Sequence, residues 1–347
     1  MSKRSPINKN EQGLALILVI FVVALGTILV VNLSHSSFLT GRSLGLAKHQ
    51  LQAEYILKSL VSLSQEVIAF DTDPSSDSFL EPWAMFKDGQ ELPLSLFGVN
   101  IPGATVVLEI IPDNSKLPLT SVIEKSDTGS ALTQKQSWLK VYERLFNSLG
   151  FDDTLLEPDE TGLLGGQIFG SREMIGNLND YQDRDEESLA DADFTGYEAQ
   201  LGNVKAKNEA IKNFSELTMV PGFSAARRQR LAAYGRFTTA TGDRQVNVNV
   251  ASREVLKAIE DELGNAYEQI QSQIQTDGKG IANQGALTGL PFMTGISTTN
   301  IGAMITYTSK VYQVIGKVTY GPRQYFVRAL VEKQAGSKSK VTQMEFF

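Results

Sequence analysis

The most apolar part of the chain is a continuous run near its N-terminus, residues 14–31, which only Gly26 and Thr27 interrupt. Beyond this run, apolar residues recur three and four positions apart as far as Phe70, and no proline occurs between Pro6 and Pro74. This spacing predicts one helix over residues 14–70, roughly 85 Å long at 1.5 Å per residue. Its first part, to about residue 32, is apolar enough to cross a bilayer, and the rest is amphipathic.

Strand patterns lie on both sides of a long helical region. Residues 92–101 alternate around Pro93, and residues 104–111 (ATVVLEII) are rich in β-branched side chains. Near the C-terminus, two alternating segments flank Gly321-Pro322 and predict an antiparallel hairpin over residues 312–320 and 324–331. Between these regions the pattern predicts helices over residues 133–149, 208–234 and 252–274, a strand over 246–250, and a loop over 275–303.

These elements predict an α+β fold that resembles a pilin. Two strands before the helical region and two after it form one antiparallel sheet, packed on the long N-terminal helix. Residues 71–124 and 305–347 would make this sheet core, and residues 125–304 would be an inserted α-helical domain. The basic segment at residues 1–13 is predicted to be a leader peptide.

Charge indicates how the chain is oriented in a membrane. Lys3, Arg4 and Lys9 precede the apolar run, so the leader is expected in the cytoplasm and the body on the other side. The chain would then be a single-pass membrane protein whose body lies outside the cytoplasm. The formal net charge of −7 argues against bulk nucleic-acid binding. The chain has no cysteine, which excludes disulfides, and both histidines lie on the predicted N-terminal helix, which argues against histidine-based catalysis.

An acidic segment is the main candidate for a ligand site. Asp183, Asp185 and Glu187 alternate along the chain, and Glu198 follows in the same acidic stretch. These carboxylates could converge from a loop on a hard cation, for which Ca²⁺ is the natural choice with oxygen-only ligands. A solvated acidic loop without metal is the simpler alternative, and hydrolysis by a carboxylate pair is a further one.

A second segment, residues 214–231 (FSELTMVPGFSAARRQRL), resembles a helix-hairpin-helix unit. In such units the glycine turn exposes backbone N–H groups that can hold a DNA phosphate, and the three arginines here would strengthen the contact. The predicted location outside the cytoplasm and the acidic surroundings favour a packing motif instead.

The start of the apolar run resembles the processing site of type IV pilins. A prepilin peptidase cuts after a glycine at the cytoplasmic face, so we expect cleavage between Gly13 and Leu14. In such proteins the new amine is usually methylated. In most pilins the fifth mature residue is a glutamate that pairs with a neighbouring subunit's amine. That position is Leu18 here, so the stalk has no buried carboxylate to offer.

Taken together, the chain resembles the K minor pseudopilins of type II secretion systems, the general secretion pathway protein K family, over nearly its whole length. The resemblance rests on Gly13 followed by a stalk without the glutamate, and on three segments: LNDYQDRD (178–185), FSELTMVPG (214–222) and VNVNVASREVL (246–256). The chain departs from the family where Asn-Thr-Ala-Pro is replaced by Asn249-Val-Ala-Ser252. The family's compact Gly-x-Glu-Asp-Asp-Tyr stretch is extended here over residues 190–198.

The resemblance implies a pilin fold with a large helical insertion, bound Ca²⁺ and no enzymatic activity. It also implies a position at the pseudopilus tip, in complex with the I and J minor pseudopilins, and a role in starting pseudopilus assembly for protein secretion across the outer membrane. Other pseudopilins and the prepilin peptidase would be further partners. An insertion of about 180 residues supports the tip position independently, because so wide a head hinders stacking of identical copies.

The amphipathic half of the N-terminal helix is the predicted partner interface. Its apolar stripe repeats at helical spacing and would pack laterally on the helices of partner subunits. The residues of this stripe are Ala53, Ile56, Leu60, Leu63 and Val67. Two other functions stay open from the sequence: a DNA-binding minor pilin of a competence-type system, and a membrane-anchored periplasmic hydrolase.

Overall fold

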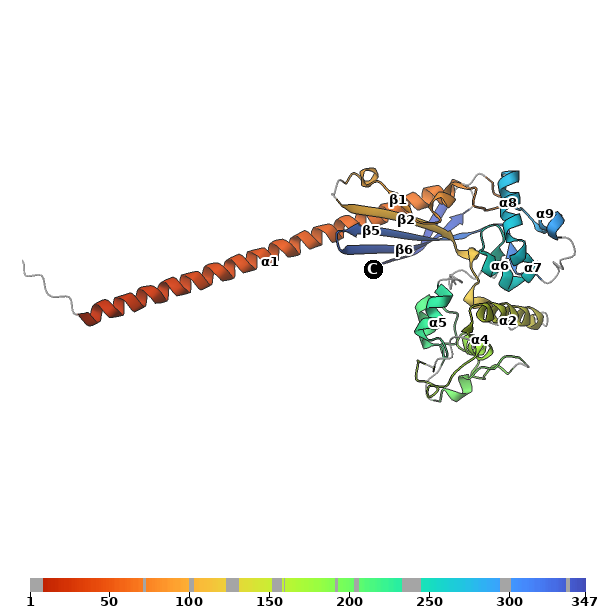
Figure 1. Ribbon diagram of the computed structural model, residues 1–347, viewed down its shortest axis with the longest axis horizontal. Coiled ribbons are helices and arrows are strands. Elements are labelled where there is room, and N and C mark those ends of the chain that lie inside the picture. Colours follow the sequence, from red (N-terminus) through yellow and green to blue (C-terminus); the bar gives the residue numbers. More distant parts are fainter. Residues whose placement is uncertain are drawn as a thin grey trace, which may run out of the picture.

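The computed structural model of the protein describes residues 9–70, 73–99, 103–122, 131–151, 158, 160–190, 193–202, 206–232, 245–293, 301–334 and 338–347. One helix, α1 (Lys9–Ala69), dominates its shape: the first half projects alone, and the second half lies along a globular head (Figure 1). The predicted long helix is therefore confirmed.

The projecting half of α1 is apolar and uncovered. Its large apolar side chains, such as Leu14, Phe21 and Val30, are about 60–70% exposed. Among the described residues, α1 is the one helix that is both long and apolar enough to cross a membrane. So much apolar surface requires a lipid or detergent environment.

The head contains a five-stranded antiparallel sheet in the order β1-β2-β5-β6-β7. Its strands are β1 (Gln90–Leu92), β2 (Ala104–Pro112), β5 (Val311–Tyr320), β6 (Arg323–Gln334) and β7 (Lys338–Phe346). The strand at 104–111 and the C-terminal hairpin are confirmed. The strand predicted over 92–101 is wrong for most of its length, because the chain turns into a 3₁₀ helix, Leu94–Phe97, directly after Pro93. The pattern did not predict β7.

The sheet covers the amphipathic half of α1, which corrects the predicted partner interface. Gly316 of β5 permits this packing, since a Cβ atom there would lie 3.0 Å from Leu60 Cδ1. Three members of the stripe lie inside the chain's own core and are not available to partner helices, so the interface prediction is contradicted for those three. Of its members, Ala53, Ile56 and Leu60 are fully buried, and Leu63 and Val67 are half-buried against the same core.

The inserted domain has its own hydrophobic core, whose residues run from Leu117 to Ile305. The helix predicted over 208–234 is reduced to a 3₁₀ helix, Phe214–Met219, and a short α5, because Pro221-Gly222 interrupts it. The helix predicted over 252–274 is divided into α6, α7 and α8. The elements of the insertion are α2 (Ala131–Ser148), α4 (Ser171–Asp180), α5 (Ala225–Arg230), α6 (Arg253–Ile259), α7 (Asp261–Asn265), α8 (Tyr267–Asp277), α9 (Gln284–Thr288), β3 (Val246–Asn247) and β4 (Ile305–Thr306).

Figure 1 shows how the insertion sits on the sheet. Helices α6 to α9 lie at the end of the head that is remote from the free end of α1, and α2, α4 and α5 form a lobe to one side. The short strands β3 and β4 pair in parallel next to the start of β5. The acidic loop belongs to the side lobe, since it follows α4 directly.

Candidate metal centre

The acidic loop begins where α4 ends, at Asp180, and folds back against that helix. The Asp180 carboxylate is 2% exposed and accepts backbone N–H bonds from Leu189 (2.9 Å) and Glu198 (3.1 Å). It therefore holds two distant points of the loop together. Burial raises the pKa of the Asp180 carboxyl, although the two N–H bonds act in the opposite direction.

Two glycines allow the loop backbone to approach α4 closely. A Cβ atom on Gly176 would lie 2.2 Å from the Thr195 carbonyl oxygen, and one on Gly196 would lie 2.0 Å from Asp180 Oδ2. Real Cβ atoms do not approach that closely, so any larger residue at either position would push the loop away from the helix. The position of Glu198, two residues after Gly196, depends on this contact.

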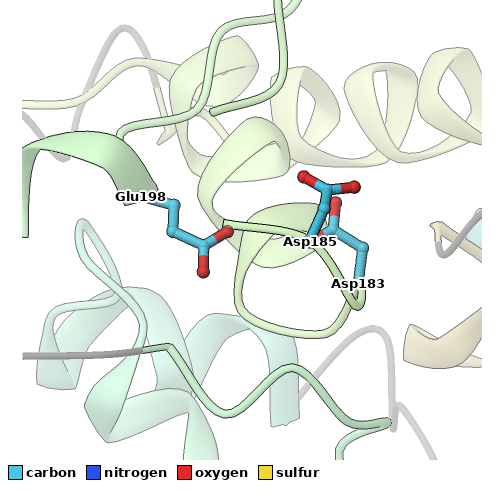
Figure 2. Close-up of side chains that lie close together, drawn as sticks. All are labelled: Asp183, Asp185 and Glu198. Carbon is cyan, nitrogen blue, oxygen red and sulfur yellow. The ribbon is translucent and has the colours of Figure 1, made fainter. Parts of the chain in front are cut away.

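Three carboxylates converge above this contact. The side chains of Asp183, Asp185 and Glu198 offer oxygen atoms that all lie within 4.8 Å of one another. Figure 2 shows Asp183 and Asp185 side by side, with Glu198 facing them from another segment. Glu198 is 8% exposed, and burial, together with the negative charge of Asp180, raises the pKa of its carboxyl to about 7.

Two asparagines, Asn179 and Asn208, contact the residues of this acidic cluster. In the described part of the chain, Glu198 Oε2, Asn179 Oδ1 and Asn208 Oδ1 are buried without a hydrogen-bond donor. The amide nitrogens of both asparagines are occupied: Asn179 donates to the Asp183 carboxylate, and Asn208 donates to the Asp185 carbonyl oxygen at 2.7 Å. A buried acceptor without a donor costs about 1–3 kcal/mol. Since Ca²⁺ prefers carboxylate and carbonyl oxygens, the residues present fit that ion.

The structure brings together three of the four predicted metal ligands. Glu187 lies outside this group of carboxylates, and its side chain is exposed. Its backbone N–H donates a hydrogen bond to Asp185 Oδ1 at 3.0 Å. The sequence analysis did not identify Asn179 and Asn208. Asn208 lies far along the chain from Asp185, and only its left-handed backbone (φ 54°) marks it as unusual.

Comparison with known proteins shows which proteins the chain resembles in sequence. No family model matches it. It is 23% identical over 338 residues to the type II secretion system protein K of Pseudomonas aeruginosa, which covers 96% of this chain and 92% of that protein. The protein of the same name from Klebsiella pneumoniae is also 23% identical over 338 residues, covering 94% of each chain. The chain is thus similar, over nearly its whole length, to type II secretion system protein K.

The fold agrees with this relationship. One chain in the crystal structure of the GspK-GspI-GspJ complex, from the type 2 secretion system of enterotoxigenic Escherichia coli, matches with a TM-score of 0.66 at 14% identity. The match covers 88% of this chain and 99% of that chain. At this identity the likeness establishes the fold: a pilin-like core with an inserted helical domain.

The hairpin segment that resembles protein K is used for packing. Arg227 is fully buried, and its guanidinium donates to the Gly222 carbonyl oxygen (2.8 Å) and to Met174 Sδ (3.2 Å). The other two arginines also donate to backbone carbonyls of the insertion: Arg228 to that of Phe223 and Arg230 to that of Leu149. Because it is buried, Arg227 cannot reach a phosphate in solvent, which removes one of the three arginines that would strengthen DNA binding.

The VNVNV segment of the protein K resemblance joins the insertion to the sheet. Asn247 Nδ2 donates to the Asp77 carbonyl oxygen (3.0 Å) and to Ser309 Oγ (2.9 Å). Asn249 Nδ2 donates to the Ile281 carbonyl oxygen at 2.9 Å, and Asn249 Oδ1 accepts the Ile281 N–H at 2.9 Å. Both asparagines are fully buried, so their side chains act as fixed structural links.

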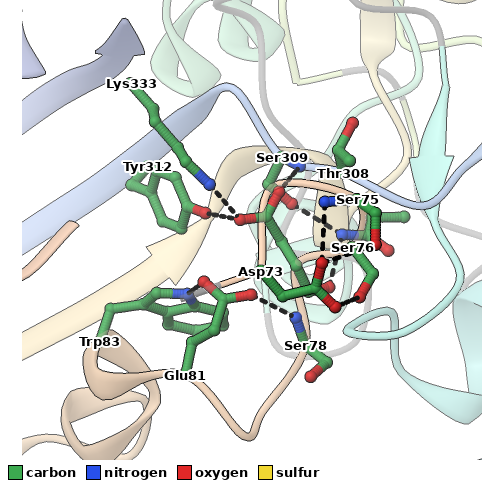
Figure 3. Close-up of polar contacts among 12 residues, drawn as sticks. Asp73, Ser75, Ser76, Ser78, Glu81, Trp83, Thr308, Ser309, Tyr312 and Lys333 are labelled. Atoms are coloured by element: carbon green, nitrogen blue, oxygen red, sulfur yellow. Dashed lines mark hydrogen bonds and ion pairs between the residues drawn. The ribbon is translucent and has the colours of Figure 1, made fainter. Parts of the chain in front are cut away.

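A buried ionic network surrounds this junction (Figure 3). Asp77 accepts bonds from the Tyr312 hydroxyl (2.9 Å), Lys333 Nζ (2.6 Å) and the Ser309 N–H (2.6 Å). Glu81 lies nearby, and burial, together with the charge of Asp77, raises the pKa of its carboxyl to about 8. The sequence analysis missed this network, because its members are single polar residues outside any motif.

Proposed function

We propose that the chain is a minor pseudopilin of a type II secretion system, with a structural and non-catalytic role. The full-length likeness to protein K carries this proposal. In it, α1 anchors the protein in the inner membrane as a single span, the leader faces the cytoplasm and the head lies in the periplasm. The pseudopilus then serves protein secretion across the outer membrane. Deleting the gene should abolish secretion, and the intact gene should restore it.

Two features favour a place at the pseudopilus tip and a role in starting assembly. The insertion makes the head far wider than the stalk, as Figure 1 shows, so identical copies would collide along a thin filament. Leu18 also offers no carboxylate to a neighbouring subunit's amine. The purified chain should therefore not polymerise alone. Filaments made of this chain only would exclude the tip position.

The I- and J-type minor pseudopilins are the proposed partners, because GspI and GspJ occur in the solved complex that contains the similar fold. Since Ala53, Ile56 and Leu60 are buried, contacts between stalks would use other apolar residues of α1. Phe38, Leu39 and Leu44 are 51–66% exposed, just before the sheet begins to cover the helix. Leu44→Glu should weaken co-purification with these partners, and the head should keep its stability.

Processing between Gly13 and Leu14 is part of the proposal. Mass spectrometry of the membrane fraction should show a chain that begins at Leu14, with a methylated amine. Gly13→Leu should leave the leader attached. Gly26→Leu is the matched control, since a side chain at Gly26 has open space around it and should not affect cleavage. A mature chain that retains residues 1–13 would contradict this part of the proposal.

We also propose that the acidic loop binds Ca²⁺. Asp183, Asp185 and Glu198 would hold the ion, with the amide oxygens of Asn179 and Asn208 available nearby. The bound cation would neutralise carboxylates that otherwise repel one another, and so would fix the loop on α4. Ca²⁺ at 100 times its dissociation constant would stabilise the fold by about 2.7 kcal/mol.

Two matched variants test the metal site. Glu198→Gln removes a charge from the carboxylate group and should weaken Ca²⁺ binding in calorimetry at least about tenfold. Glu187→Gln removes an equal charge from the same loop outside the group and should leave the affinity nearly unchanged. Absence of a binding heat in the intact chain, or equal effects of the two variants, would contradict the proposed ligand set.

A further inference from the structure

The sheet ends in an edge strand, β7, whose outer side pairs with no strand in the described part of the chain. Phe326 and Phe347 exchange two backbone hydrogen bonds, of 2.8 and 3.1 Å, which fixes the alternation along the β6–β7 ladder. Glu345, opposite Arg328, therefore directs its N–H and C=O toward β6. Met344 and Phe346, at the intervening positions, direct theirs outward.

The side chains at these outward positions are apolar and exposed. Met344 is 40% exposed and Phe346 is 43% exposed, and Lys58 Nζ of α1 lies 5.8 Å from the centre of the Phe346 ring. Tyr55 and Leu51 precede Lys58 on the same face of α1 and are 71% and 57% exposed. We call Leu51, Tyr55, Met344 and Phe346 the edge patch. In the edge patch, backbone N–H and C=O groups that have no strand partner lie beside exposed apolar side chains.

The start of β7 has the opposite character. Lys338 and Lys340 are exposed, and neither forms an ion pair with any described residue. Lysines on an edge strand discourage indiscriminate strand pairing and favour a partner with acidic residues opposite them. The edge thus has a basic end and an apolar end, in a protein whose formal net charge is −7.

The free backbone groups decide what kind of segment fits this edge. A helix satisfies its own N–H and C=O groups, so it could cover only the apolar side chains. An extended strand would use the outward groups of Met344 and Phe346 as well. We propose that the β7 edge binds an extended strand of a neighbouring pseudopilin, with acidic residues facing Lys338 and Lys340 and apolar side chains on the edge patch. This inference rests on the proposed function.

Amide hydrogen exchange of the full chain in detergent provides the main test, with the purified I- and J-type pseudopilins as the probe. In the chain alone, the Met344 and Phe346 amides should exchange fast, and the Gln343 and Glu345 amides should be protected by β6. In the complex, exchange at Met344 and Phe346 should slow at least about tenfold, because each amide gains an acceptor. Gln343 and Glu345 should change little.

Substitutions give a second readout. Met344→Pro removes an outward N–H and leaves the β6–β7 ladder intact, so it should weaken binding at least about tenfold. Met344→Ala keeps that N–H and should weaken binding less. Met219→Ala, at a 55% exposed methionine of the insertion, is the remote control and should have no effect. Replacing both Lys338 and Lys340 with glutamate should weaken binding most at low salt.

The possible outcomes separate the inference from the proposed function. A complex that forms without protection at Met344 and Phe346 would overturn strand docking and leave the minor pseudopilin function standing. Failure of the unmodified chain to bind either probe would contradict the proposed function as well. Protection that arises at high concentration of the chain alone would assign the edge to a second copy, and would also overturn the inference. Should Met344→Pro fail to fold, exchange in the unmodified chain still decides.

Discussion

Leu60 tests whether the amphipathic half of α1 is core or interface. Its side chain is fully buried under the sheet. Leu60→Ala should therefore destabilise the sheet core by about 2–5 kcal/mol, even without any partner. Gly316→Ala should overfill the same space, because the added methyl group would lie 3.0 Å from Leu60 Cδ1 and 2.8 Å from Val327 Cγ1. We expect that overpacking to cost about 1–3 kcal/mol.

The two substitutions should partly compensate each other. Truncating Leu60 removes one of the three close contacts that the methyl group at position 316 would make, whereas those with Val327 and Leu57 remain. The double variant should thus be more stable than the sum of the single effects predicts, by about 1 kcal/mol. If the stripe instead served partners, the single variants would leave the isolated chain unchanged.

The two tryptophans allow each core to be followed separately. Trp83 lies in the core between α1 and the sheet, with its ring 5.5 Å from that of Tyr312, and Trp138 lies in the core of the insertion. Urea unfolding of the full chain in detergent, followed through Trp83 in a Trp138→Phe background, gives the required free energies. Effects that add within about 0.5 kcal/mol, or an unchanged midpoint for Leu60→Ala, would refute the shared contact.

Three further predictions concern the head. Gly196→Ala should push the loop from Asp180, lower stability by about 1–3 kcal/mol and weaken Ca²⁺ binding in calorimetry, because no room exists for the methyl group. Glu81 keeps its proton in the folded state up to about pH 8, whereas the unfolded chain releases it near pH 4.5. The free energy of unfolding should therefore fall as pH rises between these values, by at most about 1.4 kcal/mol per pH unit. Glu81→Gln should flatten this slope in urea titrations. Arg227→Ala should cost about 1–3 kcal/mol in thermal unfolding of the insertion, since it leaves the buried Gly222 carbonyl without its donor.

The sequence predicted those elements whose patterns are local. The apolar run at residues 14–31 is continuous, and β5 and β6 alternate around Gly321-Pro322, so both could be identified without tertiary information. Strand β7 was missed because most of its side chains face solvent, and an edge strand of this kind has little hydrophobic alternation. A pattern of apolar residues on α1 likewise indicates a covered face and leaves open what covers it.

The metal site was accessible to sequence reasoning only in part. Asp183 and Asp185 are close in sequence and alternate, which is the kind of spacing that indicates a cation site. The amide oxygens of Asn179 and Asn208 have no such signature, because they join the carboxylates through the packing of separate segments. The hydrogen bonds from the Leu189 and Glu198 N–H groups to the Asp180 carboxylate likewise form only in the folded loop, so no sequence pattern indicates them.

The chain leaves the sheet at Pro112 and re-enters it at Val311, and these two points are neighbours, because Pro112 pairs with Tyr312 across β2 and β5. The two covalent connections of the insertion therefore lie side by side at one end of β2 and β5, where an ordinary hairpin would need only a short turn. In evolutionary terms, this adjacency lets an insertion grow within a hairpin without altering the order of the strands. The buried contacts of the insertion with the sheet, such as those of Asn247 with Asp77 and Ser309, would have to change together with it.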